Sequence, residues 1–133
     1  YTRVLALQKT FEVELRGPWI DRVTGLENCR AKCVFLSAPG QDFRLELLQY
    51  LAPTGEVLGV NSLPYTSGLR HLAFETDELD AVVERLKNGG AKIVSPPVEV
   101  PFAVGPDKLR KRLFYFYDPE GVLLEIAEYS GAY

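Results

Sequence analysis

The sequence predicts an α+β domain made of two β-α-β-β-β modules, the first of which lacks its opening strand in this chain. Two observations carry this prediction. The second half contains four segments typical of strands and one segment with the apolar spacing of a helix, and the helical segment stands second, as a β-α-β-β-β module requires. The two halves also end alike, because residues 45–50 and 124–129 share leucine, glutamate and tyrosine at an offset of 79 positions. We expect each module's sheet to curve round an open cleft.

The first half is predicted to contain strands and little helix. Residues 1–7 are interpreted as the end of a helix, because apolar side chains occur there without a preceding cap residue. Residues 9–15 alternate apolar and polar side chains, which is typical of a half-buried strand. Residues 17–25 are interpreted as a loop that carries the single tryptophan, Trp19. Further strands are predicted at 30–37 and 43–50.

The second half begins after a segment rich in proline and glycine. We interpret this segment, 52–68, as a linker between a first module, 1–51, and a second module, 69–133. A helix is predicted from a cap at Thr76 or Asp77 to about residue 88, where two glycines end it. Its buried stripe has the spacing i, i+3, i+4 and i+7 and consists of Leu79, Val82, Val83 and Leu86. The predicted strands are 69–75, 91–95, 110–117 and 122–129.

Composition narrows the class of protein. The 133 residues are 47% hydrophobic and 25% charged, as in soluble globular domains. The net charge of −3 disfavours a nucleic-acid partner. No apolar run approaches the ~20 residues of a membrane helix, and no signal-like segment is seen, so we expect a cytoplasmic protein with no membrane contact. The chain starts at Tyr1 and contains no methionine, so we expect its natural start to lie upstream.

Three side chains are candidates for a metal site. Glu46 and Glu125 lie in the middle of predicted strands, at equivalent positions of the repeat, between apolar neighbours. A carboxylate that faces an apolar environment is costly unless it is paired or bound to metal. His71, the only histidine, opens the first strand of the second module, and imidazole with carboxylate suits borderline divalent ions. A lone histidine or glutamate in a strand is usually structural, but the repeat makes us favour a site.

The sequence resembles the vicinal oxygen chelate superfamily over nearly its whole length. That superfamily includes glyoxalase I, methylmalonyl-CoA epimerase, extradiol dioxygenases, and fosfomycin and bleomycin resistance proteins. The segments that carry the resemblance are Tyr1-Thr2-Arg3-Val4-Leu5, Leu45-Glu46-Leu47, Leu69-Arg70-His71-Leu72-Ala73-Phe74, Leu86-Lys87-Asn88-Gly89-Gly90, and Asp118-Pro119-Glu120-Gly121 with Leu124-Glu125.

The resemblance implies a site and an assembly. In metal-dependent members each module gives one ligand from its first strand and one from its last, which corresponds here to Glu46, His71 and Glu125, with a fourth ligand upstream of Tyr1. The implied cofactor is a divalent ion such as Zn, Ni, Mn, Co or Fe. Glu125 and Glu46 would be the catalytic carboxylates, and Glu125 is the favoured base. The implied partners are a small-molecule substrate and a second copy in a homodimer.

Three activities stay open at this stage. We favour a metal-dependent glyoxalase-like lyase or isomerase, which abstracts a proton next to a carbonyl. An extradiol-type dioxygenase is the first alternative, since the segment around Tyr115 resembles part of that signature, but its iron needs a second histidine. A metal-free binding or resistance protein is the other alternative. The predicted substrate-binding residues are Trp19, Phe102, Arg112 and Tyr115.

The residues 108–112 form a basic run with two interpretations. It could bind a carboxylate or phosphate of the substrate, or it could be a strand end exposed to solvent.

Overall fold

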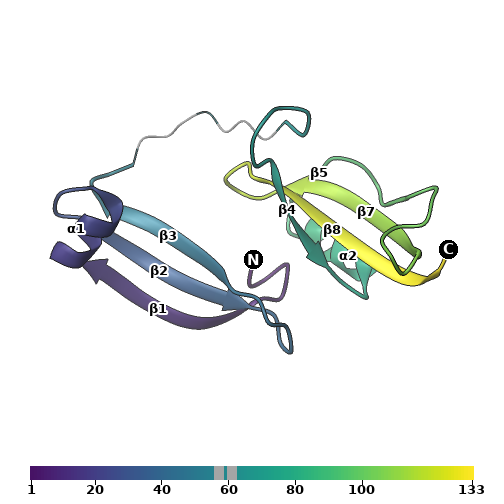
Figure 1. Ribbon diagram of the computed structural model, residues 1–133, viewed down its shortest axis with the longest axis horizontal. Helices are drawn as coiled ribbons and strands as arrows, with labels where there is room; N and C mark the ends of the chain where they lie inside the picture. The colour runs from purple at the N-terminus through teal and green to yellow at the C-terminus, as the bar shows by residue number, and fades with distance from the viewer. Residues whose placement is uncertain (56–58, 60–62) are drawn as a thin grey trace. The chain divides into compact units, whose positions relative to one another are not determined.

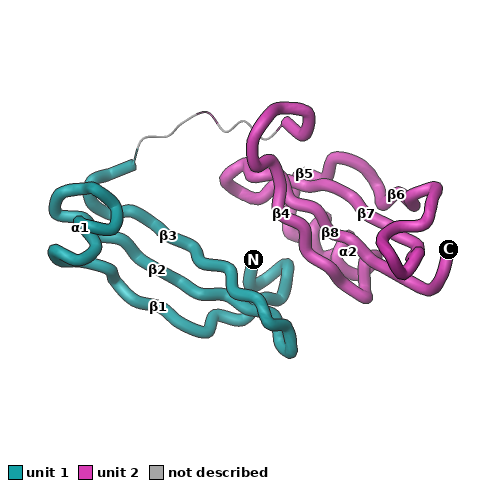
Figure 2. The backbone as a smooth tube through the Cα atoms, viewed as in Figure 1, with its two compact units in different colours: residues 1–58 teal, residues 59–133 magenta. Residues whose placement is uncertain are grey.

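A computed structural model describes residues 1–55, 59 and 63–133. The chain divides into two compact units, unit 1 (residues 1–58) and unit 2 (residues 59–133), each of which we describe by itself (Figure 2). The linker predicted at 52–68 includes residues outside the described part. That prediction, and the module boundaries that depend on it, stay predictions.

Unit 1 is a three-stranded antiparallel sheet with a short helix (Figure 1). Its strands are β1 (Gln8–Arg16), β2 (Arg30–Ser37) and β3 (Leu45–Ala52), in the order β1-β2-β3. Ala31, Cys33 and Leu36 of the central strand are buried. The three predicted strands are therefore present, with β3 displaced by two residues towards the C-terminus.

Two predictions for unit 1 are wrong. The segment 17–25 is not a plain loop, because it contains helix α1 (Pro18–Thr24). Pro18 suits the first turn, where a missing N–H costs nothing, and Gly25 ends the helix in the left-handed conformation with φ of 71°. Residues 1–7 contain bends and no helix. Apolar residues alone indicate burial there, as for Leu7 at 6% exposure, but do not establish a helical backbone.

Unit 2 has the predicted β-α-β-β-β order with one additional two-residue strand. The sheet order is β4-β8-β7-β5, with β6 also paired to β7. Strand β4 runs parallel to β8, and the other pairs are antiparallel. The elements are β4 (His71–Glu75), α2 (Leu79–Asn88), β5 (Lys92–Ile93), β6 (Val98–Glu99), β7 (Leu109–Tyr117) and β8 (Leu123–Ala132).

Helix α2 covers one face of the unit 2 sheet. The predicted stripe of Leu79, Val82, Val83 and Leu86 is buried, as expected from its spacing. Side chains alternate along a strand, so Phe114 of β7 and its register partner Ile126 of β8 share a face of the sheet, and both are buried. The helix begins after Glu78, and Thr76 accepts the Glu78 N–H through its hydroxyl at 3.1 Å.

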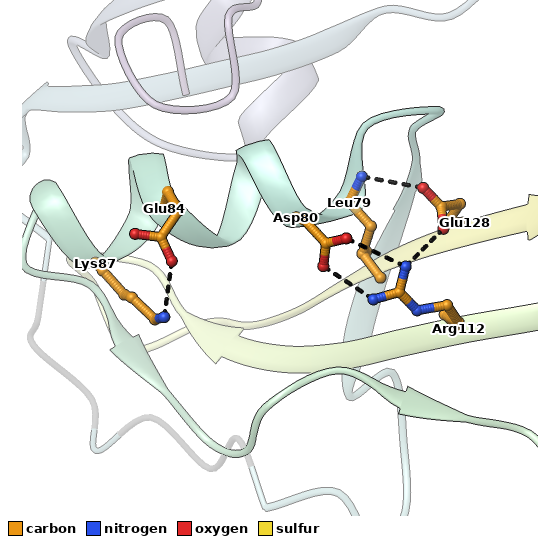
Figure 3. Close-up of polar contacts among 6 residues, drawn as sticks. All are labelled: Leu79, Asp80, Glu84, Lys87, Arg112 and Glu128. Atoms are coloured by element: carbon orange, nitrogen blue, oxygen red, sulfur yellow. Dashed lines mark hydrogen bonds and ion pairs between the residues drawn. The ribbon is translucent and has the colours of Figure 1, made fainter.

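A group of polar contacts fastens the start of α2 to this face (Figure 3). The Leu79 N–H donates to Glu128 Oε1 at 3.2 Å, which satisfies a helix N–H that has no partner within the helix. Arg112 of β7 links α2 to β8, because its guanidinium donates to Asp80 Oδ1 of α2 at 2.9 Å and to Glu128 Oε2 of β8 at 3.2 Å. None of the helices in the described ranges has the length and apolar character needed to cross a membrane.

Replacing Arg112 with Met should lower the free energy of unfolding by about 1 kcal/mol, because Asp80 and Glu128 lose a shared, partly exposed partner. Urea unfolding followed by circular dichroism measures the change. Arg110→Met is the matched control, since Arg110 pairs with an equally exposed carboxylate, Glu99, that belongs to β6 and not to α2. Equal loss in both variants would contradict the role of Arg112 in holding the helix.

Candidate functional site

Glu125 is buried in the sheet of unit 2. It is 5% exposed, and among the described residues it is the one charged side chain in the buried class. Its neighbours two positions away on β8, Leu123 and Ala127, lie on the same face and are also buried. A carboxylate in such surroundings needs charged or hydrogen-bonding partners to offset the lost hydration.

Strand pairing brings those partners to Glu125. Tyr115 of β7 is its register partner on one side and Ala73 of β4 on the other. Because side chains alternate, positions two or four residues away lie on the same face, which places His71 and Lys111 beside the carboxylate. The site therefore depends on three adjacent strands, β4, β8 and β7, and lies on the face opposite α2.

Each carboxylate oxygen of Glu125 has its own partner. Lys111 Nζ donates to Oε1 at 2.7 Å, the short distance typical of a charge-assisted hydrogen bond. His71 Nε2 lies 3.3 Å from Oε2. The Tyr115 ring lies 5.2 Å from the imidazole, centroid to centroid, and closes the group. Of the two side chains that contact the Glu125 carboxylate through a nitrogen atom, His71 is the more exposed: 35% of its side chain is accessible, against 18% for Lys111.

The Glu125 carboxylate also shifts the titration of its neighbours. Burial by itself would lower the pKa of Lys111, but hydrogen bonds and charge interactions with Glu125 and Tyr129 outweigh it, and the net pKa is raised. Burial, followed by the negative charge of Glu125, raises the pKa of Tyr115. At neutral pH the group therefore holds a lysine ammonium and a protonated phenol around the carboxylate.

The other predicted site residues lie in different surroundings. Glu46 belongs to unit 1, is exposed, and accepts from the Cys33 thiol at 3.2 Å; burial, then this carboxylate, raises the pKa of Cys33. Trp19 is on α1 of unit 1, and Phe102 is on an exposed segment of unit 2. Arg112 lies on the α2 side of its sheet, away from Glu125.

Two possible donor atoms of unit 2 lie close together. Ligand atoms at Zn²⁺ bond lengths of about 2.0–2.2 Å and a tetrahedral angle stand about 3.4 Å apart, and Nε2 of His71 and Oε2 of Glu125 stand 3.3 Å apart. Nitrogen and oxygen donors of these kinds suit borderline divalent ions. Within the described ranges no cluster of three His, Cys, Asp or Glu side chains is suited to hold a metal, so this pair offers two donor atoms and is not by itself a metal site.

Lys111 is the residue that sequence reasoning did not single out. It lies in the basic run at 108–112, and the sequence alone favoured Arg112 from that run. Alternation along β7 distinguishes the two, because Lys111 shares the parity of Tyr115, the register partner of Glu125, and Arg112 does not. The register of β7 on β8 was the missing information.

Comparison with known proteins identifies the class. A family model described as the Glyoxalase/Bleomycin resistance protein/Dioxygenase superfamily matches residues 1–126. This match covers nearly the whole chain and agrees with the α+β architecture. The chain belongs to this superfamily.

The similarity to individual proteins covers only part of the chain or has low sequence identity. The "Uncharacterized protein YaeR" of Escherichia coli (strain K12) is 39% identical over 67 residues, which cover 50% of this chain and 46% of that protein, so the match spans about half of each. A glyoxalase family protein from Bacillus cereus is 27% identical, with a TM-score of 0.80 over 94% of this chain and 79% of that one. Glyoxalase I of Leishmania major, 17% identical with a TM-score of 0.55 over 96% of this chain and 73% of that one, shows the fold alone.

Proposed function

We propose that the chain is a metal-dependent lyase or isomerase of the glyoxalase type. It acts on a small molecule by removing a proton from the carbon next to a carbonyl. The observation that carries this proposal is the pairing of His71 Nε2 with Glu125 Oε2 at 3.3 Å, on a strand where Leu123 and Ala127 are buried on either side of the glutamate. Superfamily membership supports it, because the superfamily includes glyoxalase I, to whose structure this fold is similar.

His71 and Glu125 of unit 2 would hold the ion, and Glu46 stays a prediction for the same role. When bound, a divalent ion supplies a Lewis acid that polarises the substrate carbonyl and stabilises the negative charge formed after proton loss. Zn, Ni, Mn, Co and Fe all accept such donors, and the proposal includes any of them. His71 would act as a fixed ligand, because a ring nitrogen that binds metal cannot also accept a proton.

Carboxylate side chains of this chain would transfer the proton. Glu125 would accept it from the carbon next to the carbonyl through Oε2, because Lys111 holds Oε1, and Oε2 would then not be bound to the ion. It would return the proton to the adjacent carbon, so the reaction needs no oxidant. Its low exposure keeps water from competing for that proton. Glu46 is the second carboxylate that could exchange this role. Tyr115, whose ring lies beside the imidazole, is proposed to contact the substrate, and Trp19, Phe102 and Arg112 stay predictions for this task.

The direct test is metal content together with turnover. Protein loaded with Zn²⁺, Ni²⁺, Co²⁺, Mn²⁺ or Fe²⁺ and then desalted should retain metal, measured by elemental analysis. Turnover should appear with hemithioacetals or acyl-CoA thioesters, vanish with a chelator and return with the ion. Retention of metal with turnover of catechols would identify the dioxygenase instead. A chain that retains none of the ions would contradict the proposal.

One observation favours a second candidate, a metal-free binding protein that forms a homodimer. Lys111 already neutralises the Glu125 carboxylate at 2.7 Å, so the site is charge-balanced without a metal ion. In this case His71 and Tyr115 would contact a small ligand directly. Ligand binding with equal affinity in the presence and absence of a chelator would support it. Assembly as a homodimer and a cytoplasmic location belong to either proposal.

A further inference from the structure

We propose that the sheet of unit 2 binds a small planar aromatic carboxylate on the face opposite α2. The ring of this ligand would lie on Tyr117 and Val94, and its carboxylate would meet the ammonium of Lys92. The inference goes beyond the proposed function, because this binding needs neither a metal ion nor turnover. Its basis is an exposed apolar strip, formed by Val94 and Val98, with the exposed Lys92 at one end.

Strands β5 and β7 lie side by side (Figure 1), and their pairing places these side chains on one face of the sheet. Lys92 of β5 is the register partner of Tyr117 of β7. Two residues further on, Val94 donates its backbone N–H to the carbonyl oxygen of Tyr115 at 2.9 Å, so it lies beside that residue. Because side chains alternate along a strand, Lys92 and Val94 share the face of Tyr115 and Tyr117, which is also the face of Glu125.

The strip on this face is apolar and accessible. Val94 is 55% exposed, and Val98 of β6, the register partner of Leu113, is 57% exposed. On the other face, Phe114 and Phe116 of β7 are buried. Adjacent exposed apolar side chains on a folded protein mark sites of interaction. Valine side chains that project from a sheet beside a tyrosine ring present a flat surface, which suits a planar ligand.

Lys92 determines the charge of the ligand. Its ammonium lies 5.0 Å from the centroid of the Tyr117 ring, and within the described ranges it makes no ion pair with a carboxylate. Lys111 on the same face is held by Glu125 at 2.7 Å, so its charge is already balanced. A carboxylate of the ligand would complete an ion pair with Lys92 while the attached ring contacts the ring of Tyr117.

A planar aromatic acid fits this surface better than a flexible fatty acid does. An offset or edge-to-face contact between two rings adds to the free energy gained from apolar burial. A flexible chain would lose rotational freedom when it lies flat on the sheet, whereas a rigid ring has little to lose. The ligand is therefore expected to be small and rigid, with one carboxylate attached to its ring system.

Cinnamate is the probe, titrated against the full chain in the presence of a chelator and followed by the amide signals in NMR spectra. Signals of residues 92–94 and 113–117 should shift, and those of α2 should not. Cinnamyl alcohol, which lacks the charge, and octanoate, which lacks the ring, should bind more weakly. Lys92→Met should weaken cinnamate binding about two- to fivefold, the contribution of an exposed ion pair. Lys87→Met, at an exposed lysine of α2, should bind cinnamate as the unmodified protein does.

Each result that differs from these expectations contradicts a stated part of the proposal. Equal cinnamate affinity in Lys92→Met and the unmodified protein, or equal affinity for cinnamyl alcohol, overturns the role of the charge. Octanoate that binds as tightly as cinnamate overturns the aromatic class. Absence of cinnamate binding, or shifts confined to other residues, overturns the site itself. None of these results bears on the proposed function, which is tested by metal retention and turnover in separate experiments without the chelator.

Discussion

Replacing Glu125 with Gln should reduce turnover by about 10²- to 10⁴-fold, the usual contribution of a positioned general base. An amide has nearly the shape of the carboxylate and cannot accept the proton. Lys111 is still 18% exposed, so its ammonium can reach water when its partner becomes neutral. We therefore expect the variant to remain folded, which far-ultraviolet circular dichroism and the melting temperature would verify.

The loss of turnover has two possible origins, because Glu125 is proposed both as a ligand and as the base. Elemental analysis of the same preparation separates them: retained metal with lost turnover assigns the loss to proton transfer. Glu120→Gln is the matched control, since Glu120 is an exposed carboxylate in the turn between β7 and β8. Full turnover in Glu125→Gln would show that another group removes the proton, with Glu46 as the next candidate.

The elements of unit 2 follow from local patterns in the sequence. The apolar spacing of α2 and the pair of glycines after Asn88 determine the helix, because few other arrangements could bury those four side chains together. In unit 1 the same local reasoning missed α1. Its seven residues have no extended apolar stripe, and the proline at its start and glycine after its end were interpreted as loop signals.

The candidate site depends on a different kind of information. His71 and Glu125 are far apart in sequence and meet because β4 pairs in parallel with β8, a long-range contact that no local pattern encodes. Resemblance to a superfamily supplied that pairing, whereas composition and periodicity did not. Lys111 is a second example of a contact that the local sequence does not predict. Four basic residues occur in the run 108–112, and the register of β7 on β8 shows which of them faces Glu125.

The two faces of the unit 2 sheet therefore have separate tasks. On one face α2 packs on apolar side chains and is fastened by Arg112. On the other face the carboxylate of Glu125 meets Lys111 and His71. A substitution on the α2 face should change stability without changing the chemistry of the site, and this separation can be measured.

Phe114→Ala should lower the free energy of unfolding by about 3–5 kcal/mol, the range for removing a buried aromatic ring. Phe114 is 2% exposed, and its ring lies 6.1 Å from that of Phe116, centroid to centroid. Its side chain projects from β7 to the face opposite Tyr115, so the cavity would open beneath α2 and away from the carboxylate. Urea unfolding followed by circular dichroism measures the loss.

Phe114→Leu is the matched control and should lose less, because the leucine side chain fills part of the cavity. At a temperature where Phe114→Ala is still folded, its Zn²⁺ affinity should equal that of the unmodified protein, since His71 and Glu125 keep their places on the other face. A large fall in Zn²⁺ affinity in the folded variant would show that packing beneath α2 also positions the ligands. The separation of tasks between the two faces would then be wrong.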